Sequence, residues 1–403
     1  MARARTLRRL MATVVPGFRF STISAGIRKD GRIDVALAVA DAPAVVAGVF
    51  TRNLVRAAPV LIASERTRAG TARAILVNSG CANACTGEPG LAATRDSTAA
   101  VAKALGVPAE SVLPASTGVI GAILPANRIA EKAVDLAAAL SADASADFAT
   151  AIMTTDRWQK VATTTLRRGD AQATVLAIGK GAGMMHPDVG PPQATMLVFL
   201  FTDAKVERGE LERALIDSTD ATFNCCSVDG DTSTNDSVFA LASGVSGLSA
   251  SAAELTPAFT EVCEVLARSM VADGEGANHE IEIRVSGLPS KEAARTVART
   301  VATSLLVKTA LFGEDANWGR LLAAAGRAGV AFDPNRAGIR VGDVSIVENG
   351  LGLGKEAELR ANEILRTKSY TIELTLGSGP GSARYLTSDL GHGYVDVNAG
   401  YRS

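Results

Sequence analysis

The sequence is poor in several kinds of residue, and each shortage excludes a class of protein. Aromatic residues make up only 4% of the 403 residues, which argues against base-stacking surfaces for nucleic acid. Lys and Arg total 41 and Asp and Glu total 42, so the net charge of -1 produces no field that attracts nucleic acid or an anionic membrane. No apolar run approaches the roughly 20 residues that span a bilayer. We therefore expect small-molecule partners, no nucleic acid and no membrane.

Cysteine and histidine are also scarce. Five cysteines, an odd number in a long chain, argue against a secreted disulfide framework and favour a reducing compartment. The pairs Cys81/Cys85 and Cys225/Cys226 are poorly spaced for zinc, so we expect no metal. The three histidines form no His-x3-His pair, and neither a Gly-x-Ser-x-Gly elbow nor an early Gly-x-Gly-x-x-Gly occurs. Serine–histidine hydrolysis, metal hydrolysis and a dinucleotide cofactor are therefore weakly supported.

What is present is an alternation of strand and helix patterns with an ample hydrophobic content of 47%. Apolar runs and alternating stretches predict strands, and 3.6-residue periodicity predicts helices. The expected strands cover residues 33–40, 44–51, 74–78, 161–167, 173–178, the apolar run from 196, 280–285, 370–376 and a short one from 394. The expected helices cover 91–105, 125–140, 146–154, 210–218, 256 to about 272, and 290–306. Residues 1 to about 16 are expected to be a flexible tail. This order predicts an α/β body.

A loop rich in glycine and proline, from Gly179 to Gln193, leads into the apolar run. Thr195 lies at this boundary after the small Ala194, so the carbonyl of Ala194 is unshielded. A threonine that becomes an N-terminus can be its own nucleophile and base, because its α-amino group has a pKa of about 8. The same hydroxyl can cut the chain by attacking the Ala194 carbonyl. The alternative is an ordinary loop before a core strand.

Three further places carry candidate chemistry. Thr117-Gly118 offers a hydroxyl beside an uncluttered backbone N–H, which suits a developing oxyanion, although a simple turn is the alternative. Glu275 stands between two glycines after a helix. His186, in the central loop, is a candidate base, although a solvated loop histidine is the commoner case.

The central stretch resembles the signature of a known enzyme family. Lys180-Gly181-Ala182-Gly183-Met184-Met185, followed by Ala194-Thr195-Met196-Leu197, is similar to the glutamate N-acetyltransferase (ornithine acetyltransferase) family of arginine biosynthesis, the ArgJ family. The resemblance covers essentially the whole chain. Other segments that match in order are residues 47–51, 78–87, 116–121, 153–156, 227–236, 273–277, 308–310, 317–320 and 398–403.

The resemblance implies a layered α/β sandwich of the ArgJ/DmpA type that cleaves itself at Ala194-Thr195. The products would be an α chain, 1–194, and a β chain, 195–403, assembled as an α2β2 heterotetramer. It also implies a ping-pong transfer of acetyl from N-acetylornithine to glutamate through acetyl-Thr195, which releases ornithine and N-acetylglutamate. No cofactor is implied. Whether acetyl-CoA also serves as an acetyl donor is left open by the sequence.

The family pattern assigns roles to particular residues. Thr117 and Gly118 would form the oxyanion hole. Substrate would be bound by Thr154, Lys180, Thr195, Glu275, Asn398 and Ser403. The chemistry of two of these agrees independently, because Lys180 suits an α-carboxylate and Glu275 suits the ammonium of ornithine.

The chain departs from the family pattern in three places, and two other functions stay open. Residues 190–193 lengthen the loop between Lys180 and Thr195, while Arg157-Trp158-Gln159 and Asn278-His279 replace the usual residues. The alternatives are a self-processed aminopeptidase or amidase of related architecture, and an uncleaved ligand-binding relative. A cytoplasmic location is expected, or the mitochondrial matrix if the Arg-rich N-terminus is a transit peptide.

Overall fold

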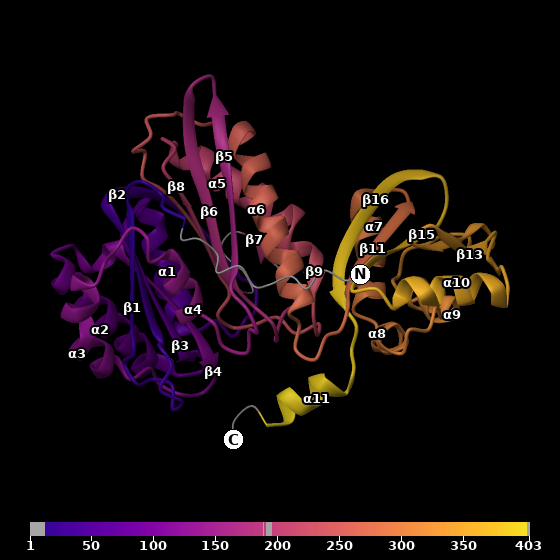
Figure 1. The fold of residues 1–403 in the computed structure, drawn as a ribbon, viewed down its shortest axis with the longest axis horizontal. Helices are drawn as coiled ribbons and strands as arrows, with labels where there is room; N and C mark the ends of the chain where they lie inside the picture. Colours follow the sequence, from indigo (N-terminus) through magenta and orange to yellow (C-terminus); the bar gives the residue numbers. More distant parts are fainter. Residues whose placement is uncertain (1–12, 188, 191–195, 401–403) are drawn as a thin grey trace, which may run out of the picture. The chain divides into compact units, whose positions relative to one another are not determined.

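The computed structural model describes residues 13–187, 189–190 and 196–400, which form two compact units. The first unit takes its residues from Met1–Gly181, Asp188–Ala221 and Thr232–Leu266. The second takes them from Ala182–Pro187, Thr222–Asp231 and Ala267–Ser403. Each unit combines one sheet with helices (Figure 1), so the predicted layered α/β fold is confirmed.

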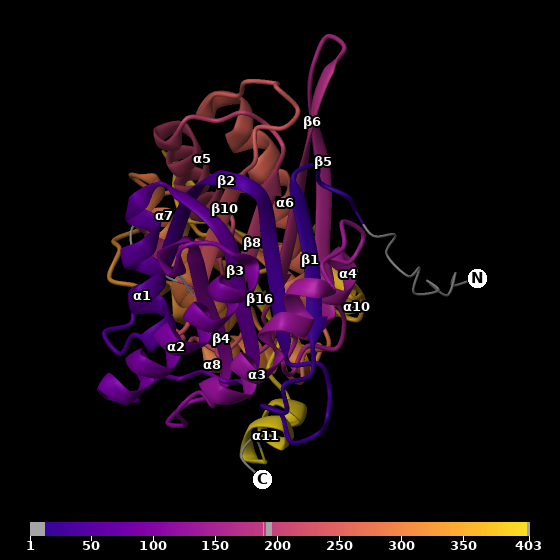
Figure 2. The ribbon, with the colours of Figure 1, turned by 90° about the vertical axis from the view of Figure 1, so that its left-hand side faces the viewer.

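The described residues of the first unit build a sheet in the order β4-β3-β2-β10-β8-β6-β5, with β1 and β7 also paired to β2. Its strands are β1 (Phe18–Ile23), β2 (Val35–Thr51), β3 (Thr71–Cys81), β4 (Val112–Val119), β5 (Lys160–Arg168), β6 (Ala171–Lys180), β7 (Val189–Gly190), β8 (Leu197–Thr202) and β10 (Ser237–Ala242). Its helices are α1 (Ala58–Arg66), α2 (Gly87–Leu105), α3 (Ala126–Ala138), α4 (Ser145–Ala151) and α5 (Arg208–Ala221). Figure 2 shows the β5–β6 hairpin reaching beyond the other strands of this unit.

Both faces of this sheet are buried. Along β2, the odd-numbered residues from Val35 to Val39 join one hydrophobic cluster, and the even-numbered residues from Ala36 to Ala40 join another. This follows from the two-residue period of a strand, which sends successive side chains to opposite faces. β8 is buried along its whole length, as its unbroken apolar sequence predicts.

The second unit has a sheet in the order β14-β13-β12-β15-β11-β16-β9. Its strands are β9 (Cys226–Ser227), β11 (Glu280–Gly287), β12 (Gly338–Val341), β13 (Val344–Glu348), β14 (Leu351–Gly352), β15 (Ser369–Thr375) and β16 (Gly379–Ser388). Its helices are α7 (Lys291–Ala302), α8 (Leu305–Phe312), α9 (Trp318–Gly326), α10 (Lys355–Leu365) and α11 (His392–Ala399), and α6 (Ala252–Ala272) runs from the first unit into the second. Short 3-10 helices cover Thr67–Ala69, Ala109–Ser111, Phe223–Cys225 and Pro334–Arg336. Within the described part of the chain, no helix is both long and apolar enough to cross a bilayer.

Several expected boundaries are wrong at the N-terminal side. The ordered body begins before residue 16, because Val15 is fully buried in the core. The two strands expected at 33–40 and 44–51 form one strand, β2. The residues between them stay in the strand because the pairing with β3 shifts register between Val39 and Ala44. Such an irregularity accommodates Pro43, which has no N–H to donate.

The helix expected from Thr256 begins earlier, at Ala252. Its true start resembles a capping box, since the Glu254 carboxylate accepts hydrogen bonds from the backbone N–H and the hydroxyl of Ser251. Pro257 lies inside the helix. Val265, an apolar residue of this helix, is 50% exposed.

Two more expected elements differ. The single helix expected at 290–306 is two helices, α7 and α8, because the chain becomes extended at Ser304. The strand expected from 394 is a helix, α11. Val395 and Val397 alternate as in a strand, but they are 63% and 38% exposed, so their spacing does not mark a buried face.

Candidate active site

Thr117 and Gly118 lie near the end of β4, beside the parallel strand β3. Gly118 has a φ of +131°, and a β-carbon there would lie 2.4 Å from the carbonyl carbon of Gly80. Both facts require glycine, because side chains avoid this φ and a backbone atom cannot move away cheaply. The predicted Thr-Gly pair is therefore a backbone close-packing point as well as a pair of polar groups.

Buried polar side chains fix this end of β4. The Ser116 hydroxyl donates to Asn78 Oδ1 at 2.6 Å. The Asn235 side-chain amide donates to the carbonyls of Ser116, at 2.9 Å, and of Ala82, at 2.6 Å. These bonds link β3, β4 and the loop before β10. Because satisfied buried networks are rigid, Thr117 is held in a defined position.

Lys180 ends β6, and its Nζ donates to the Thr117 Oγ1 at 2.8 Å. Thr117 is 8% exposed. A hydroxyl that accepts from an ammonium group must direct its own hydrogen elsewhere. The contact therefore orients Thr117 as a hydrogen-bond donor.

Thr154 lies in the loop after α4. Its backbone N–H donates to Asp156 Oδ2 at 3.0 Å. The other carboxylate oxygen, Oδ1, accepts from Lys160 Nζ at 2.7 Å and from the backbone N–H of Gly181 at 2.8 Å. One buried carboxylate thus joins the Thr154 loop to the end of the strand that carries Lys180.

Glu275 and Asn398 meet within the second unit. Asn398 Nδ2 donates to Glu275 Oε2 at 2.9 Å and to the carbonyl of Tyr394 at 3.0 Å. The backbone N–H of Glu275 donates to the carbonyl of Ala182 at 2.9 Å. Gly276 has a φ of +70°, and a β-carbon there would lie 2.2 Å from Tyr394 N. The glycine after Glu275 therefore lets α11 approach, and α11 carries Asn398 to the carboxylate.

The surroundings of Glu275 are acidic. Burial raises the pKa of the Tyr394 phenol, and Asp229, Asp231 and Glu275 raise it further. Burial also raises the pKa of Asp229, although backbone N–H groups oppose this. Asp229 Oδ1 accepts from the backbone N–H of Met185 at 2.8 Å. Carboxylates gathered in this way favour a cationic ligand.

Both short segments that depart from the family pattern make defined contacts. Within the first unit, the Arg157 guanidinium lies 4.9 Å from the ring centre of Trp158. Within the second unit, the backbone N–H groups of Asn278 and His279 donate to Asp389 Oδ1 at 2.8 and 3.0 Å. His279 Nδ1 lies 3.3 Å from Asp389 Oδ2. The replacement residues thus tie the segment after Glu275 to the end of β16.

The predicted site residues divide between the two units. Thr117, Gly118, Thr154 and Lys180 belong to the first, and Glu275 and Asn398 to the second. Ala194, Thr195 and Ser403 lie outside the described residues. On either side of the predicted cleavage point, β7 pairs with β2, and the carbonyl of Met196 accepts from Ser237 N at 2.6 Å.

Asp156 lies in the segment 153–156, which matches the family pattern, but the sequence predicted no role for it. The signal was an acid four residues before Lys160, a lysine directly before the strand expected at 161–167. In the structure the Lys160 side chain is fully buried. Buried lysines almost always have a partner. His186, the candidate base, lies in the second unit, 3.4 Å from the Tyr385 hydroxyl. No cluster of three or more metal-ligating side chains occurs among residues 13–187, 189–190 and 196–400.

Comparison with known proteins matches this architecture to one family. A model of the family described as "ArgJ family" matches residues 19–403. The chain is 45% identical over 395 residues to the arginine biosynthesis bifunctional protein ArgJ of Geobacter sulfurreducens, covering 96% of this chain and all of that one. It is 46% identical over 397 residues to the protein of the same name from Nitratidesulfovibrio vulgaris, covering 98% of this chain and all of that one.

Two solved structures are also similar. The crystal structure of ArgJ from Bacillus halodurans is 36% identical, with a TM-score of 0.48, and the match covers 50% of this chain and 98% of that one. Ornithine acetyltransferase from Mycobacterium tuberculosis, solved with ornithine, is 35% identical, with a TM-score of 0.40 over 46% of this chain and 98% of that one.

The chain is therefore an enzyme of the acyltransferase class. It belongs to the ArgJ family, whose named members act in arginine biosynthesis.

Proposed function

We propose that this protein transfers acetyl from N-acetylornithine to glutamate by a ping-pong mechanism through acetyl-Thr195. The observation that carries the proposal is the 2.8 Å hydrogen bond from Lys180 to Thr117. This bond leaves the Thr117 hydroxyl proton available for an oxyanion. The backbone N–H of Gly118 lies next to it, and no larger residue fits at position 118. Family membership supports the same reading.

The first step is maturation. The hydroxyl of Thr195 attacks the carbonyl of Ala194, and the peptide bond is exchanged for an ester that frees the α-amino group of Thr195. Water then opens the ester. The products are an α chain that ends at Ala194 and a β chain with an N-terminal threonine, and the amino group is now placed to act as its base.

Acetyl transfer follows in two halves. Thr195 Oγ attacks the acetyl carbonyl of N-acetylornithine, and its proton moves to its own α-amino group. Thr117 and Gly118 donate to the resulting oxyanion, a contact of ~3 kcal/mol for each donor. The intermediate collapses by breaking the C–N bond, and ornithine leaves with the proton. The amine of glutamate then attacks the acetyl ester, which releases N-acetylglutamate and restores Thr195.

Charge supports the choice of substrate. Lys180 would bind an α-carboxylate, Thr154 would also bind substrate, and the acidic surroundings of Glu275 and Asn398 would bind the side-chain ammonium of ornithine. Ser403, at the C-terminus, would complete the set. The ornithine present in the Mycobacterium tuberculosis relative is in keeping with this assignment.

We further propose acetyl-CoA as a second acetyl donor, because the curated relatives carry the name bifunctional. No resident cofactor is needed for the chemistry. The α2β2 assembly and the cytoplasmic location, or the mitochondrial alternative, stay predictions. A native-mass measurement and fractionation of the producing cell test them.

The decisive experiment is an acetyl-transfer assay combined with intact-mass spectrometry. With N-acetylornithine alone, the chain starting at Thr195 should gain one acetyl group, and adding glutamate should remove it as N-acetylglutamate. An aminopeptidase or amidase would instead release ornithine without forming N-acetylglutamate. One uncut chain without activity would favour the ligand-binding alternative.

A further inference from the structure

The loop between α4 and β5 is organised by one carboxylate. Asp156 and Lys160 form an ion pair of 2.7 Å in which both side chains are fully buried. The same carboxylate accepts the backbone N–H groups of Thr154 and Gly181. Asp156 therefore uses both oxygens inside the protein, in three hydrogen bonds to two segments that are far apart in the sequence.

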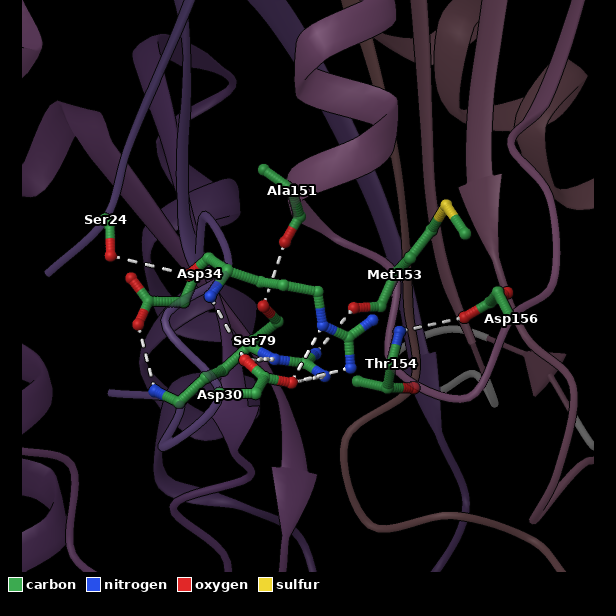
Figure 3. A network of polar contacts seen from close by, with 10 residues as sticks. Ser24, Asp30, Asp34, Ser79, Ala151, Met153, Thr154 and Asp156 are labelled. Atoms are coloured by element: carbon green, nitrogen blue, oxygen red, sulfur yellow. Dashed lines mark hydrogen bonds and ion pairs between the residues drawn. The ribbon is translucent and has the colours of Figure 1, made fainter. Parts of the chain in front are cut away.

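The opposite side of this loop is also anchored (Figure 3). Arg28 Nη1 donates to the carbonyl of Met153 at 3.0 Å, and its guanidinium pairs with Asp30 at 3.1 Å. The Ser79 hydroxyl donates to the carbonyl of Ala151 at 2.9 Å. The backbone before Thr154 is thus tied to β3 and to the loop after β1. Asp156 supplies the remaining tie, toward β6.

Two ammonium groups act on this carboxylate. Burial alone would raise the pKa of Asp156, but Lys160, then Lys180, and the hydrogen bonds together hold it below its usual value. The group is therefore an anion at neutral pH. Lys160 cannot be solvated where it lies, so it requires the anion as its partner. The Nζ of Lys180, the second of these ammonium groups, donates to Thr117.

We propose that Asp156 is a positioning residue for acetyl transfer, which fixes the spacing between Thr154 and the Lys180 end of β6. The inference rests on the proposed function, in which Thr154 and Lys180 bind substrate. Asp156 itself would not touch substrate. Its removal leaves the binding groups present but loosely spaced, so substrate binding should suffer more than the chemical step.

The primary test is Asp156→Asn. An amide keeps the size, but one of its two ends can no longer accept a hydrogen bond. We expect KM for N-acetylornithine to rise roughly tenfold, in line with the loss of a charge-assisted hydrogen bond, while kcat changes less than about threefold. Asp203→Asn is the matched control, because Asp203 is 5% exposed and accepts Thr174 N, near the start of β6, at 2.6 Å. KM should stay at the wild-type value in this control. An unchanged KM in Asp156→Asn, or an equal rise in both variants, would overturn the proposal.

A second variant covers the case in which Asp156→Asn fails to fold because Lys160 is left without an anion. Asp156→Asn combined with Lys160→Met removes both charges, and replacing a whole buried pair is often tolerated. We expect this double variant to be folded and to keep the raised KM. If its KM is that of the wild type, Asp156 has only a folding role. If the wild type itself transfers no acetyl to glutamate, the proposed function fails and the inference fails with it, whereas an active wild type isolates the role of Asp156.

Discussion

Gly183 lies directly against the carboxylate of Glu275, so that a β-carbon at Gly183 would be 2.2 Å from Glu275 Oε2. The two residues are about ninety positions apart in the sequence, and both belong to the second unit. A methyl group at Gly183 would have to push the carboxylate aside. Because the carboxylate is the far end of a flexible side chain, it can move without disturbing the backbone, at the expense of its hydrogen bond from Asn398.

Gly183→Ala should therefore weaken substrate binding and leave stability nearly unchanged. We expect KM for N-acetylornithine to rise roughly tenfold, the effect of losing one charge-assisted contact, with a thermal midpoint close to that of the wild type. Steady-state kinetics and calorimetry measure the two effects. Gly326→Ala is the control, since a β-carbon there meets no atom within 4 Å. A wild-type KM in a fully cleaved Gly183→Ala protein would show that the Glu275 position does not control binding.

Thr117→Ala should slow acetyl transfer by roughly ten- to a thousandfold, because one oxyanion donor is lost. Thr117→Ser keeps the hydroxyl and should retain most of the rate. Single-turnover formation of the acetylated β chain measures the affected step. Equal rates in Thr117→Ala and the wild type would remove this hydroxyl from the oxyanion hole.

Thr195→Ala should leave the chain uncut and inactive, because the proposed nucleophile of both reactions is absent. Denaturing intact-mass spectrometry would give one species for the variant and two for the wild type. Thr195→Ser, which keeps a hydroxyl, is the control and should still be cut. Cleavage and acetyl transfer by Thr195→Ala would contradict the assignment.

We expect Lys308 to make the stability of the second unit depend on pH. Its Nζ donates to the Thr387 hydroxyl at 3.1 Å, and burial lowers its pKa to about 8, although Asp389 and Asp229 oppose the shift. Between about pH 8 and 10 the unfolded chain binds more protons than the folded chain, so the free energy of unfolding rises with pH through this window.

Lys308→Met should abolish that rise. Denaturant unfolding at several pH values from 7.5 to 10 would measure it as the difference between wild type and variant. The exposed Lys291, at the start of α7, supplies the control variant Lys291→Met, which should follow the wild type. A parallel pH dependence in wild type and Lys308→Met would show that Lys308 does not titrate in this window.

Local sequence patterns predicted most of the fold. They failed where an element's structure depends on pairing with residues that are distant in the sequence. The strands β5 and β6, the fully apolar strand β8 and the helix α2 follow from local patterns alone, because those patterns repeat or persist along the chain. The strand expected at Val395 and Val397 was wrong because alternation without a neighbouring strand has no buried face to mark. The bulge in β2 likewise depends on pairing with β3, which no local pattern reveals.

In the candidate site, too, some residues could be predicted from the sequence and others depend on contacts that only the fold creates. Thr117, Lys180 and Glu275 could be proposed from their residue types and their resemblance to a family. The role of Asp156 could not, because its importance comes from two backbone N–H groups and a lysine that only the fold brings together. Gly183 was named only as part of the family signature, and its close approach to Glu275 is a property of the fold.

The segment Ala182–Pro187 belongs to the second unit, although the residues before and after it in the sequence belong to the first. There Met185 is buried, and its carbonyl accepts the N–H of Val228 at 2.7 Å. In the other direction, β8 and β10 come after residue 195 yet lie inside the sheet of the first unit. A cut at Ala194-Thr195 would thus give two interlaced polypeptides, each holding part of the other's core. In that case folding would have to come before cutting, and the two chains, once unfolded, would have to reassociate by diffusion.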